Sequence, residues 1–154
     1  MARYVIDTGI LLGYLRASSY ALFVDKQYFP FTSPNNAVIS IVTQGELQSL
    51  ALQLHWGVNK QQHLKTLLRR IPYVDISNAA VLQRYAAIDA FSQGKLNAKA
   101  LPVGTSSRNM GKNDLWIAAT ASVLNATLLT TDDDFTHLNR VFVTVVYIDP
   151  KTTP

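Results

Sequence analysis

The stretch NDLWIAATASVLNATLLTTDDDF, from Asn113 to Phe135, carries two hydrophobic patterns in succession. From Asp114 to Leu124 apolar and small residues follow the spacing of a closely packed helix, whereas ATLLTT, residues 126 to 131, is typical of a short buried strand. Acidic residues mark both ends, with Asp114 where the helix is expected to begin and three aspartates directly after the strand. A helix followed at once by a buried strand indicates an α/β fold.

Four further segments have the short, β-branched character of buried strands. They are RYVID (3 to 7), AVISIV (37 to 42), YVDI (73 to 76) and VFVTVVYI (141 to 148). Helical patterns lie between them, at GELQSLALQLHW (45 to 56), KQQHLKTLLRRI (60 to 71) and AVLQRYAAIDAF (80 to 91). Apolar strands that alternate with helices predict a mainly parallel sheet buried on both faces, and therefore an α/β sandwich.

The composition is that of one globular domain over residues 1–154, with 48% hydrophobic residues. No apolar run approaches the roughly 20 residues needed to cross a membrane, and the start, MARYVIDTG, lacks the pattern of a signal peptide. We therefore expect a cytoplasmic protein. The chain has no cysteine, which excludes disulfides, thiolate metal sites and cysteine nucleophiles but leaves oxygen-ligated metals open.

The net charge of +4 is distributed unevenly along the chain. From Leu50 to Asn113 there are nine basic residues but only two acids, whereas the segment from Asp114 to Asp134 holds four aspartates and no base. Such runs are often solvated helix faces. The alternative is a basic surface around an acidic centre, which suits a polyanion whose phosphates meet a metal site.

Acidic side chains lie at the junctions where predicted strands end and helices begin. Asp7 ends the first strand, and Asp132 follows the fourth. Glu46, the only glutamate, is expected in the first turn of the helix after the second strand, and Asp114 opens its own helix. The carboxyl ends of parallel strands share one edge of a sheet, so these four acids can converge although they are far apart in the sequence.

Four converging carboxylates would favour a bound cation. Two carboxylates about 4 Å apart repel by about 4 kcal/mol at an effective dielectric of roughly 20, and a divalent ion offsets that repulsion. Oxygen ligands alone suit Mg²⁺ or Mn²⁺. Because such ions activate water and stabilise the attacking and leaving oxygens, the pattern favours phosphodiester hydrolysis.

Each acid also has a purely structural explanation. Asp7 and Asp132 could cap helices, and the charge of Asp114 could favour its helix dipole. Thr43 and Glu46 have the spacing of a capping box. Capping does not require the four acids to share one edge of a sheet, so a common site is the simpler interpretation.

Three segments resemble the conserved blocks of PIN-domain nucleases, especially the VapC-type toxins of prokaryotic toxin–antitoxin systems. The segments are YVIDTGILLGYL (4 to 15), SIVTQGEL (40 to 47) and NDLWIAATASVLNATLLTTDDDF (113 to 135). The resemblance implies a five-stranded parallel sheet between helices, a three-layer α/β/α arrangement. It also implies a Mg²⁺- or Mn²⁺-dependent ribonuclease site, frequent homodimerisation and, for the toxins, inhibition by an antitoxin partner.

In this resemblance the first three acids of the family correspond to Asp7, Glu46 and Asp114, and the fourth acidic position corresponds to Asp132. These four residues are the predicted catalytic and metal-binding set. Two further residues, Thr130 and Asp134, are expected to support the site. Thr130 would bind a water at the metal, and Asp134 would order the turn that follows the strand.

Gly9 is a departure from the family, which usually has Asn or Ser at this position. Such a side chain is expected to brace the site, so its loss puts the detailed geometry in question. The alternative function is therefore a PIN-fold module that binds RNA or a protein but cleaves weakly or not at all.

The segment from Ser92 to Asn113 has no regular pattern, and we expect a mobile loop there. It carries four basic residues and no acid: Lys95, Lys99, Arg108 and Lys112. The hypothesis is that these side chains help to hold the RNA substrate beside Asp114.

Overall fold

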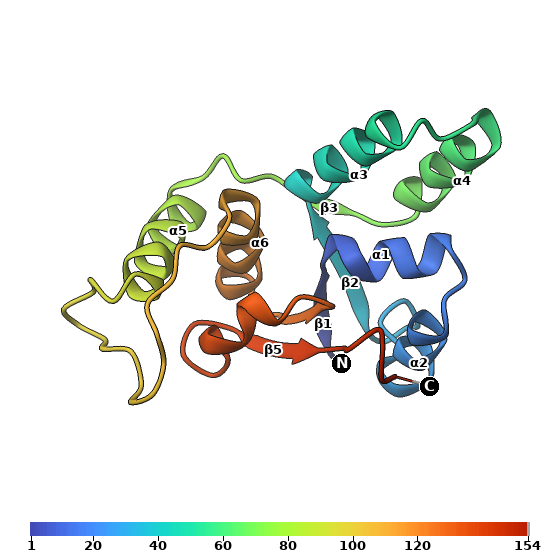
Figure 1. The fold of residues 1–154 in the computed structure, drawn as a ribbon. Helices are drawn as coiled ribbons and strands as arrows, with labels where there is room; N and C mark the ends of the chain where they lie inside the picture. The colour runs from blue at the N-terminus through green and yellow to red at the C-terminus, as the bar shows by residue number, and fades with distance from the viewer. Residues whose placement is uncertain (154) are drawn as a thin grey trace.

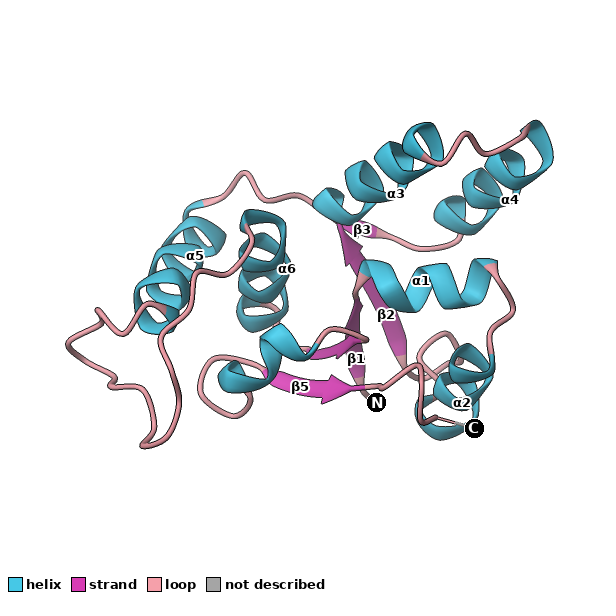
Figure 2. Ribbon diagram, in the orientation of Figure 1, coloured by secondary structure: helices cyan, strands magenta, loops and turns pink. Residues whose placement is uncertain are grey.

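Five parallel strands form one sheet at the centre of the structure, in the order β3-β2-β1-β4-β5 (Figures 1 and 2). The computed structural model describes residues 1–153. The strands are β1 (Arg3–Ile6), β2 (Asn36–Ser40), β3 (Tyr73–Val74), β4 (Thr127–Thr130) and β5 (Thr144–Tyr147). Each neighbouring pair is parallel, so the predicted five-stranded parallel sheet is confirmed.

Helices cover both faces of this sheet. They are α1 (Thr8–Leu15), α2 (Ser19–Tyr28), α3 (Ile41–Gln53), α4 (Val58–Arg69), α5 (Ala79–Ser92), α6 (Lys112–Val123) and the 3-10 helix η1 (Asp133–Leu138). The first four helices pack in one core, and α5, α6 and η1 pack in another. The predicted three-layer sandwich is therefore confirmed.

The alternation of side chains along the central strands separates the two cores. Val5 and Leu128 lie in the core with α5 and α6, whereas the next residues, Ile6 and Leu129, lie in the core with α1 to α4. All four side chains are fully buried. Successive residues of a strand point to opposite faces, so strands that are apolar throughout can be buried on both sides.

Several element boundaries differ from the sequence prediction by a few residues, and the differences at two strands are the most informative. The strand predicted from 37 to 42 ends at Ser40, and α3 begins at Ile41 because the Ser40 hydroxyl accepts a hydrogen bond from the Val42 amide and caps the helix. The capping box of Thr43 and Glu46 is therefore wrong. Glu46 lies in the second turn of α3, not in the first.

The strand predicted from 141 to 148 is also shorter in the structure and starts at Thr144. Val141, Phe142 and Val143 belong to a turn whose amides donate to the Leu138 carbonyl at the end of η1. No helix in the described part of the chain, residues 1–153, is long and apolar enough to cross a membrane.

Candidate metal centre

The acids predicted from the sequence meet at the carboxyl edge of the sheet. Asp7 follows β1, Glu46 lies in α3 after β2, Asp114 lies in the first turn of α6 and Asp132 follows β4. Their proximity is visible in the electrostatics of Asp114. Burial is the largest cause of a rise in the pKa of this carboxyl to about 7, and the charges of Asp7, Asp132, Glu46 and Asp134 contribute to that rise, in that order.

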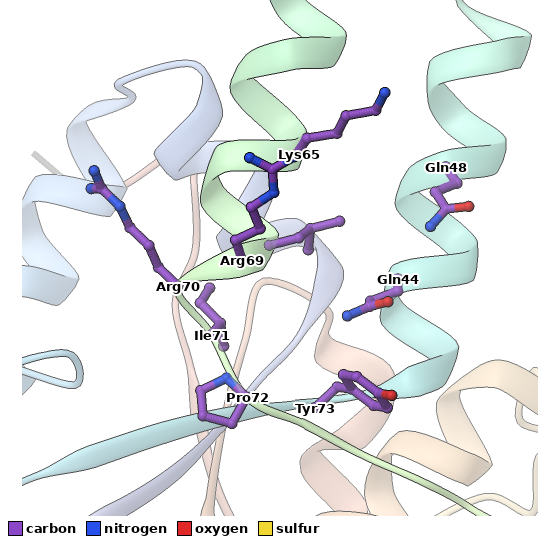
Figure 3. A pocket seen from close by; sticks show the side chains of 9 residues that line it. Gln44, Gln48, Lys65, Arg69, Arg70, Ile71, Pro72 and Tyr73 are labelled. Carbon is purple, nitrogen blue, oxygen red and sulfur yellow. The ribbon is translucent and has the colours of Figure 1, made fainter.

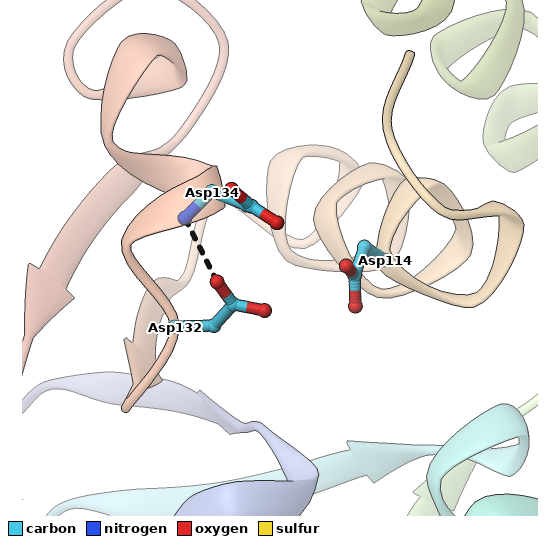
Figure 4. Close-up of side chains that lie close together, drawn as sticks. All are labelled: Asp114, Asp132 and Asp134. Atoms are coloured by element: carbon cyan, nitrogen blue, oxygen red, sulfur yellow. Dashed lines mark hydrogen bonds between the residues drawn. The ribbon is translucent and has the colours of Figure 1, made fainter. Parts of the chain in front are cut away.

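Three of these carboxylates form the tightest cluster (Figure 4). Asp114, Asp132 and Asp134 each offer one oxygen, and these oxygens all lie within 4.8 Å of one another. Asp132 also caps η1, because its Oδ1 accepts a hydrogen bond of 2.9 Å from the Asp134 amide. Its second oxygen points toward Asp114, so capping and clustering are compatible in one side chain.

Asp134 contributes more to this cluster than the sequence suggested. It was expected only to order the turn, and its amide does donate to Asp132. Its carboxylate nevertheless joins the group of three close oxygens. Three adjacent acids after a strand were the signal, but only the start of η1 at Asp133 decides which of them faces Asp114.

Asp7 is held from both sides within the protein. Only 6% of its surface is exposed. Its Oδ1 accepts a hydrogen bond of 2.8 Å from the Thr8 amide, and its Oδ2 accepts one of 2.6 Å from the Thr130 hydroxyl. Burial, with a smaller contribution from the charges of Glu46 and Asp132, raises the pKa of Asp7 to about 6 despite these two hydrogen bonds.

Thr130 supports the site through hydrogen bonds with two acidic residues, and its expected contact with a water at the metal stays a prediction. Its hydroxyl donates to Asp7 and accepts a hydrogen bond of 3.0 Å from the Asp132 amide. The side chain is fully buried. Thr130 therefore positions two acids of the site directly.

Thr8 was missed by the sequence analysis. Its amide donates to Asp7, and its hydroxyl donates to Glu46 Oε1 at 2.7 Å. One residue thus joins the acid after β1 to the acid in α3. The only signal was a hydroxyl residue directly after Asp7, which cannot reveal a partner 38 positions away.

The missing side chain at Gly9 has a physical explanation. A Cβ atom at this position would lie 2.0 Å from Thr131 Oγ1 and 3.3 Å from Thr131 Cβ. No side chain fits without displacing Thr131, because real Cβ contacts are much longer. The Thr131 hydroxyl thus occupies the space that a side chain at position 9 would need.

The four basic residues of the loop lie in different places. Arg108 lines a cavity of about 370 Å³ together with Asp134, and it lines a neighbouring cavity with Lys95. Lys99 is directed away, because its Nζ donates to the Val141 carbonyl and lies 4.7 Å from the centre of the Phe142 ring. Lys112 is exposed at the start of α6, two residues before Asp114.

The loop is fastened beside the acids through Ser92. The Ser92 carbonyl accepts a hydrogen bond of 2.7 Å from the Arg108 amide. The Ser92 hydroxyl lies 2.7 Å from His137 Nε2 and is itself fully buried. Because His137 and Asp134 belong to the same short helix, this contact fixes Arg108 relative to the carboxylate cluster.

An open cavity of about 470 Å³ leads to the acids between α3 and α6. Glu46 and Asn113 line its inner end, and Ser49 and Gln53 extend it along α3. Val42 and Leu50 also line this cavity, so its wall is partly polar and partly apolar next to Glu46.

A parallel α/β/α sandwich that gathers acids at the carboxyl ends of its strands belongs to the class of open α/β domains that bind ligands at this edge of the sheet. Within that class, the sequence profile of the PIN domain matches residues 4–141. The chain belongs to the PIN domain family, as the three sequence blocks indicated.

Solved structures of similar fold come from bacterial complexes. The chain is similar to VapBC2 from Rickettsia felis bound to a promoter DNA fragment, with a TM-score of 0.71, 22% identity and coverage of 96% of this chain and 99% of that one. It is similar to VapBC-1 from nontypeable Haemophilus influenzae, with a TM-score of 0.68, 22% identity and coverage of 94% and 97%.

A third similar structure is VapBC-5 from Mycobacterium tuberculosis, described as a member of the VapBC family of toxin–antitoxin systems. It has a TM-score of 0.60, 20% identity and coverage of 96% of this chain and 100% of that one. Comparison with curated protein sequences gives no match. At these identities the three structures establish the fold.

Proposed function

We propose that this protein is a metal-dependent endoribonuclease and the toxin of a VapBC-type toxin–antitoxin pair. The observation that carries the proposal is the close group of Asp114, Asp132 and Asp134 beside Glu46 and the buried Asp7. Membership of the PIN family and the similarity to VapBC proteins support it.

The carboxylates suit a hard divalent cation. Three oxygens within 4.8 Å of one another can be drawn onto a single Mg²⁺ or Mn²⁺, which prefers oxygen ligands. Asp114, Asp132 and Asp134 would hold the ion, with Asp7 and Glu46 close enough to complete or extend the ligand set. Such an ion would supply positive charge to the phosphate and acidify the attacking water.

The surrounding residues have distinct tasks in this proposal. Thr8 and Thr130 fix the orientation of Asp7, and Thr8 also fixes Glu46. Arg108 lies on the cavity shared with Asp134, where its guanidinium can bind a substrate phosphate through paired hydrogen bonds. Lys95 and Lys112 add positive charge nearby. Lys99 instead donates a hydrogen bond to the Val141 carbonyl in the turn before β5.

The partners follow from the same proposal. An antitoxin protein is proposed because one similar structure is described as a member of a family of toxin–antitoxin systems. A second copy of this chain is proposed because the VapC-type toxins that the sequence resembles frequently form homodimers. The proposed place of action is the cytoplasm, where the RNA substrate is found.

Paired variants of neighbouring acids test the function. Asn caps a helix as well as Asp, so Asp132→Asn preserves η1 and removes one charge from the cluster. Asp133→Asn removes the adjacent, exposed charge and serves as the matched control. With labelled RNA and Mn²⁺, we expect cleavage by the wild type and by Asp133→Asn, and its loss in Asp132→Asn. Cleavage without divalent ions, or equal cleavage by all three proteins, would refute the mechanism.

The alternative of an inactive binding module depended on Gly9. The position of Thr131 weakens that argument, because the space next to Gly9 is filled and holds a hydroxyl group. The active enzyme is therefore the function that we favour.

A further inference from the structure

A further cavity, with none of the site's carboxylates in its lining, lies between α3 and α4 (Figure 3). It has a volume of about 530 Å³ and ends at the segment that leads into β3. Its polar wall comes from two helices: Gln44 and Gln48 are one turn apart on α3, and Lys65 and Arg69 are one turn apart on α4. Tyr73 closes one end, next to Gln44. We call this cavity the α3–α4 groove.

The charge of the α3–α4 groove is entirely positive. From Gly57 to Val74 the chain contains four basic residues and no Asp or Glu. The opposite wall, α3, has one acid, Glu46, which lines the other cavity and accepts the Thr8 hydroxyl. The walls of the groove thus supply no carboxylate to its cations, so a complementary ligand is anionic.

The remaining chemistry of the groove suits a nucleotide. Tyr73 is 57% exposed although it belongs to the sheet, so one side of its ring is available to a ligand. Exposed aromatic rings beside basic side chains are the usual elements of single-strand nucleic-acid binding, in which bases stack on rings and phosphates meet cations. Gln44 and Gln48 add amide groups that can hydrogen-bond to the edges of an unpaired base.

Helix α3 connects the groove to the carboxylate site. Gln44 lines the groove, and Glu46, two residues later, faces the acids. Residues two apart lie on nearly opposite sides of a helix, so the two cavities lie on either side of α3. A strand bound at the acids can cross the exposed Gly45 and enter the groove.

We propose that the α3–α4 groove is a second binding site for single-stranded RNA. A phosphate binds Lys65 and Arg69, and a base stacks on Tyr73, so the groove retains a segment of the substrate several nucleotides from the cleaved bond. This inference rests on the proposed function, because the same RNA would occupy both sites. An acidic segment of a partner protein is the competing ligand.

The test compares two matched double variants of the whole protein. Lys65→Gln with Arg69→Gln removes two of the positive charges of the groove. Arg16→Gln with Lys26→Gln removes two exposed positive charges elsewhere, one directly after α1 and one on α2. Binding of a labelled RNA of about twelve nucleotides is measured without divalent ions over a range of salt concentrations. We expect the groove variant to bind about tenfold more weakly and its salt slope to fall by about 1.4, because each cation on a single strand contributes about 0.7. The control pair should match the wild type.

Tyr73→Leu separates stacking from charge. We expect about fivefold to tenfold weaker binding with an unchanged salt slope, since stacking on an aromatic ring is not ionic. In the presence of Mn²⁺, the groove variant should cleave a tetranucleotide as the wild type does and should lose kcat/KM only on long RNA. Circular dichroism checks that each variant is folded.

Three results would overturn the inference. The first is equal RNA affinity in the groove variant and the wild type, and the second is an equal loss of RNA affinity in the control pair. The third comes from measuring polyglutamate binding to the same proteins: the groove variant loses polyglutamate binding but keeps RNA binding. The last result would identify the groove as a docking site for an acidic protein segment. If no RNA is cleaved by any protein, the proposed function fails, but the binding measurement still decides whether the groove holds RNA.

Discussion

The two sides of the carboxylate site are built differently. On one side, Asp7 is buried, and both of its oxygens accept hydrogen bonds from Thr8 and Thr130. On the other side, Asp114 is half-buried among like charges, which raise its pKa together with burial. The first side is positioned by the protein itself. The second, with Asp132 and Asp134, holds carboxylates whose mutual repulsion a bound cation would relieve, so metal binding should complete the geometry there.

The largest effect is expected at the repelled side. Asp114→Asn should lower RNA cleavage by at least about 100-fold, because a charged ligand of the metal is lost. The same change should raise the unfolding temperature of the metal-free protein, because one of the mutually repelling charges disappears. Thermal unfolding in a chelator and cleavage with Mn²⁺ measure the two effects. A fall in both activity and stability would show that repulsion between Asp114 and the neighbouring carboxylates does not destabilise the metal-free protein.

The pH dependence of stability tests the buried side. The pKa of Asp7 is about 6 in the folded protein and about 3.8 when unfolded, so the folded state keeps a proton that the unfolded state releases. Raising the pH through this window therefore lowers the free energy of unfolding, by about 3 kcal/mol for a shift of this size. Asp7→Asn should remove this part of the slope and leave the part that comes from Asp114, whose pKa is raised to about 7.

His137 makes the comparison with Asp7→Asn necessary. Burial lowers the pKa of His137 to about 4, so its contribution to stability rises with pH over part of the same window. The difference between wild type and Asp7→Asn in urea unfolding cancels that contribution. A difference that does not change between pH 4 and pH 7 would show that Asp7 is not perturbed. Mn²⁺ at neutral pH should restore the stability of the wild type.

Gly9 tests the packing between the two sides. Gly9→Ala places a methyl group 2.0 Å from Thr131 Oγ1 and should cost about 1–3 kcal/mol of stability, although alanine is the better helix former. Adding Thr131→Ala removes that close contact and should recover most of the loss. Chemical denaturation of the two single variants and the double variant measures the coupling. Additive effects would argue against the contact.

The smallest effect is expected at Thr8. Thr8→Val keeps the shape and the amide that donates to Asp7 but removes the hydroxyl that donates to Glu46. We expect metal affinity to fall by about tenfold, as is common when a group that orients a ligand is removed. Calorimetric titration with Mn²⁺ measures the change, with Thr8→Ser as the control. A Thr8→Val protein that binds Mn²⁺ like wild type would show that Glu46 needs no such support.

The layers of the fold and the meeting of the acids were predictable because both follow from simple periodicities. Apolar strands that alternate with helices indicate a parallel sheet, and the ends of parallel strands lie at one edge. Asp7 and Asp132 stand at such ends in the sequence. Nothing more than strand order was needed to bring them near Asp114.

The details that depend on contacts between distant segments were not predictable. The bond from Thr8 to Glu46 depends on how α1 packs against α3, and the clash of Gly9 with Thr131 depends on how α1 meets the end of β4. The β-strand preference of single residues also gave a wrong prediction at one boundary. Ile41 and Val42 are β-branched and were predicted as strand, but the hydroxyl of Ser40 caps a helix that starts there.

The placement of α3 constrains how this chain can change in length. Its Gln44 and Glu46 serve cavities on opposite sides of one helix. One inserted residue between Ser40 and Gln44 would rotate everything after it by about 100° relative to β2, because a helix turns once every 3.6 residues. Both cavities would lose their residues together. Insertions beyond Gln53, where the chain leaves the helix, would not change the directions in which Gln44 and Glu46 point. The end of α3 is therefore the place where a change in length can be tolerated.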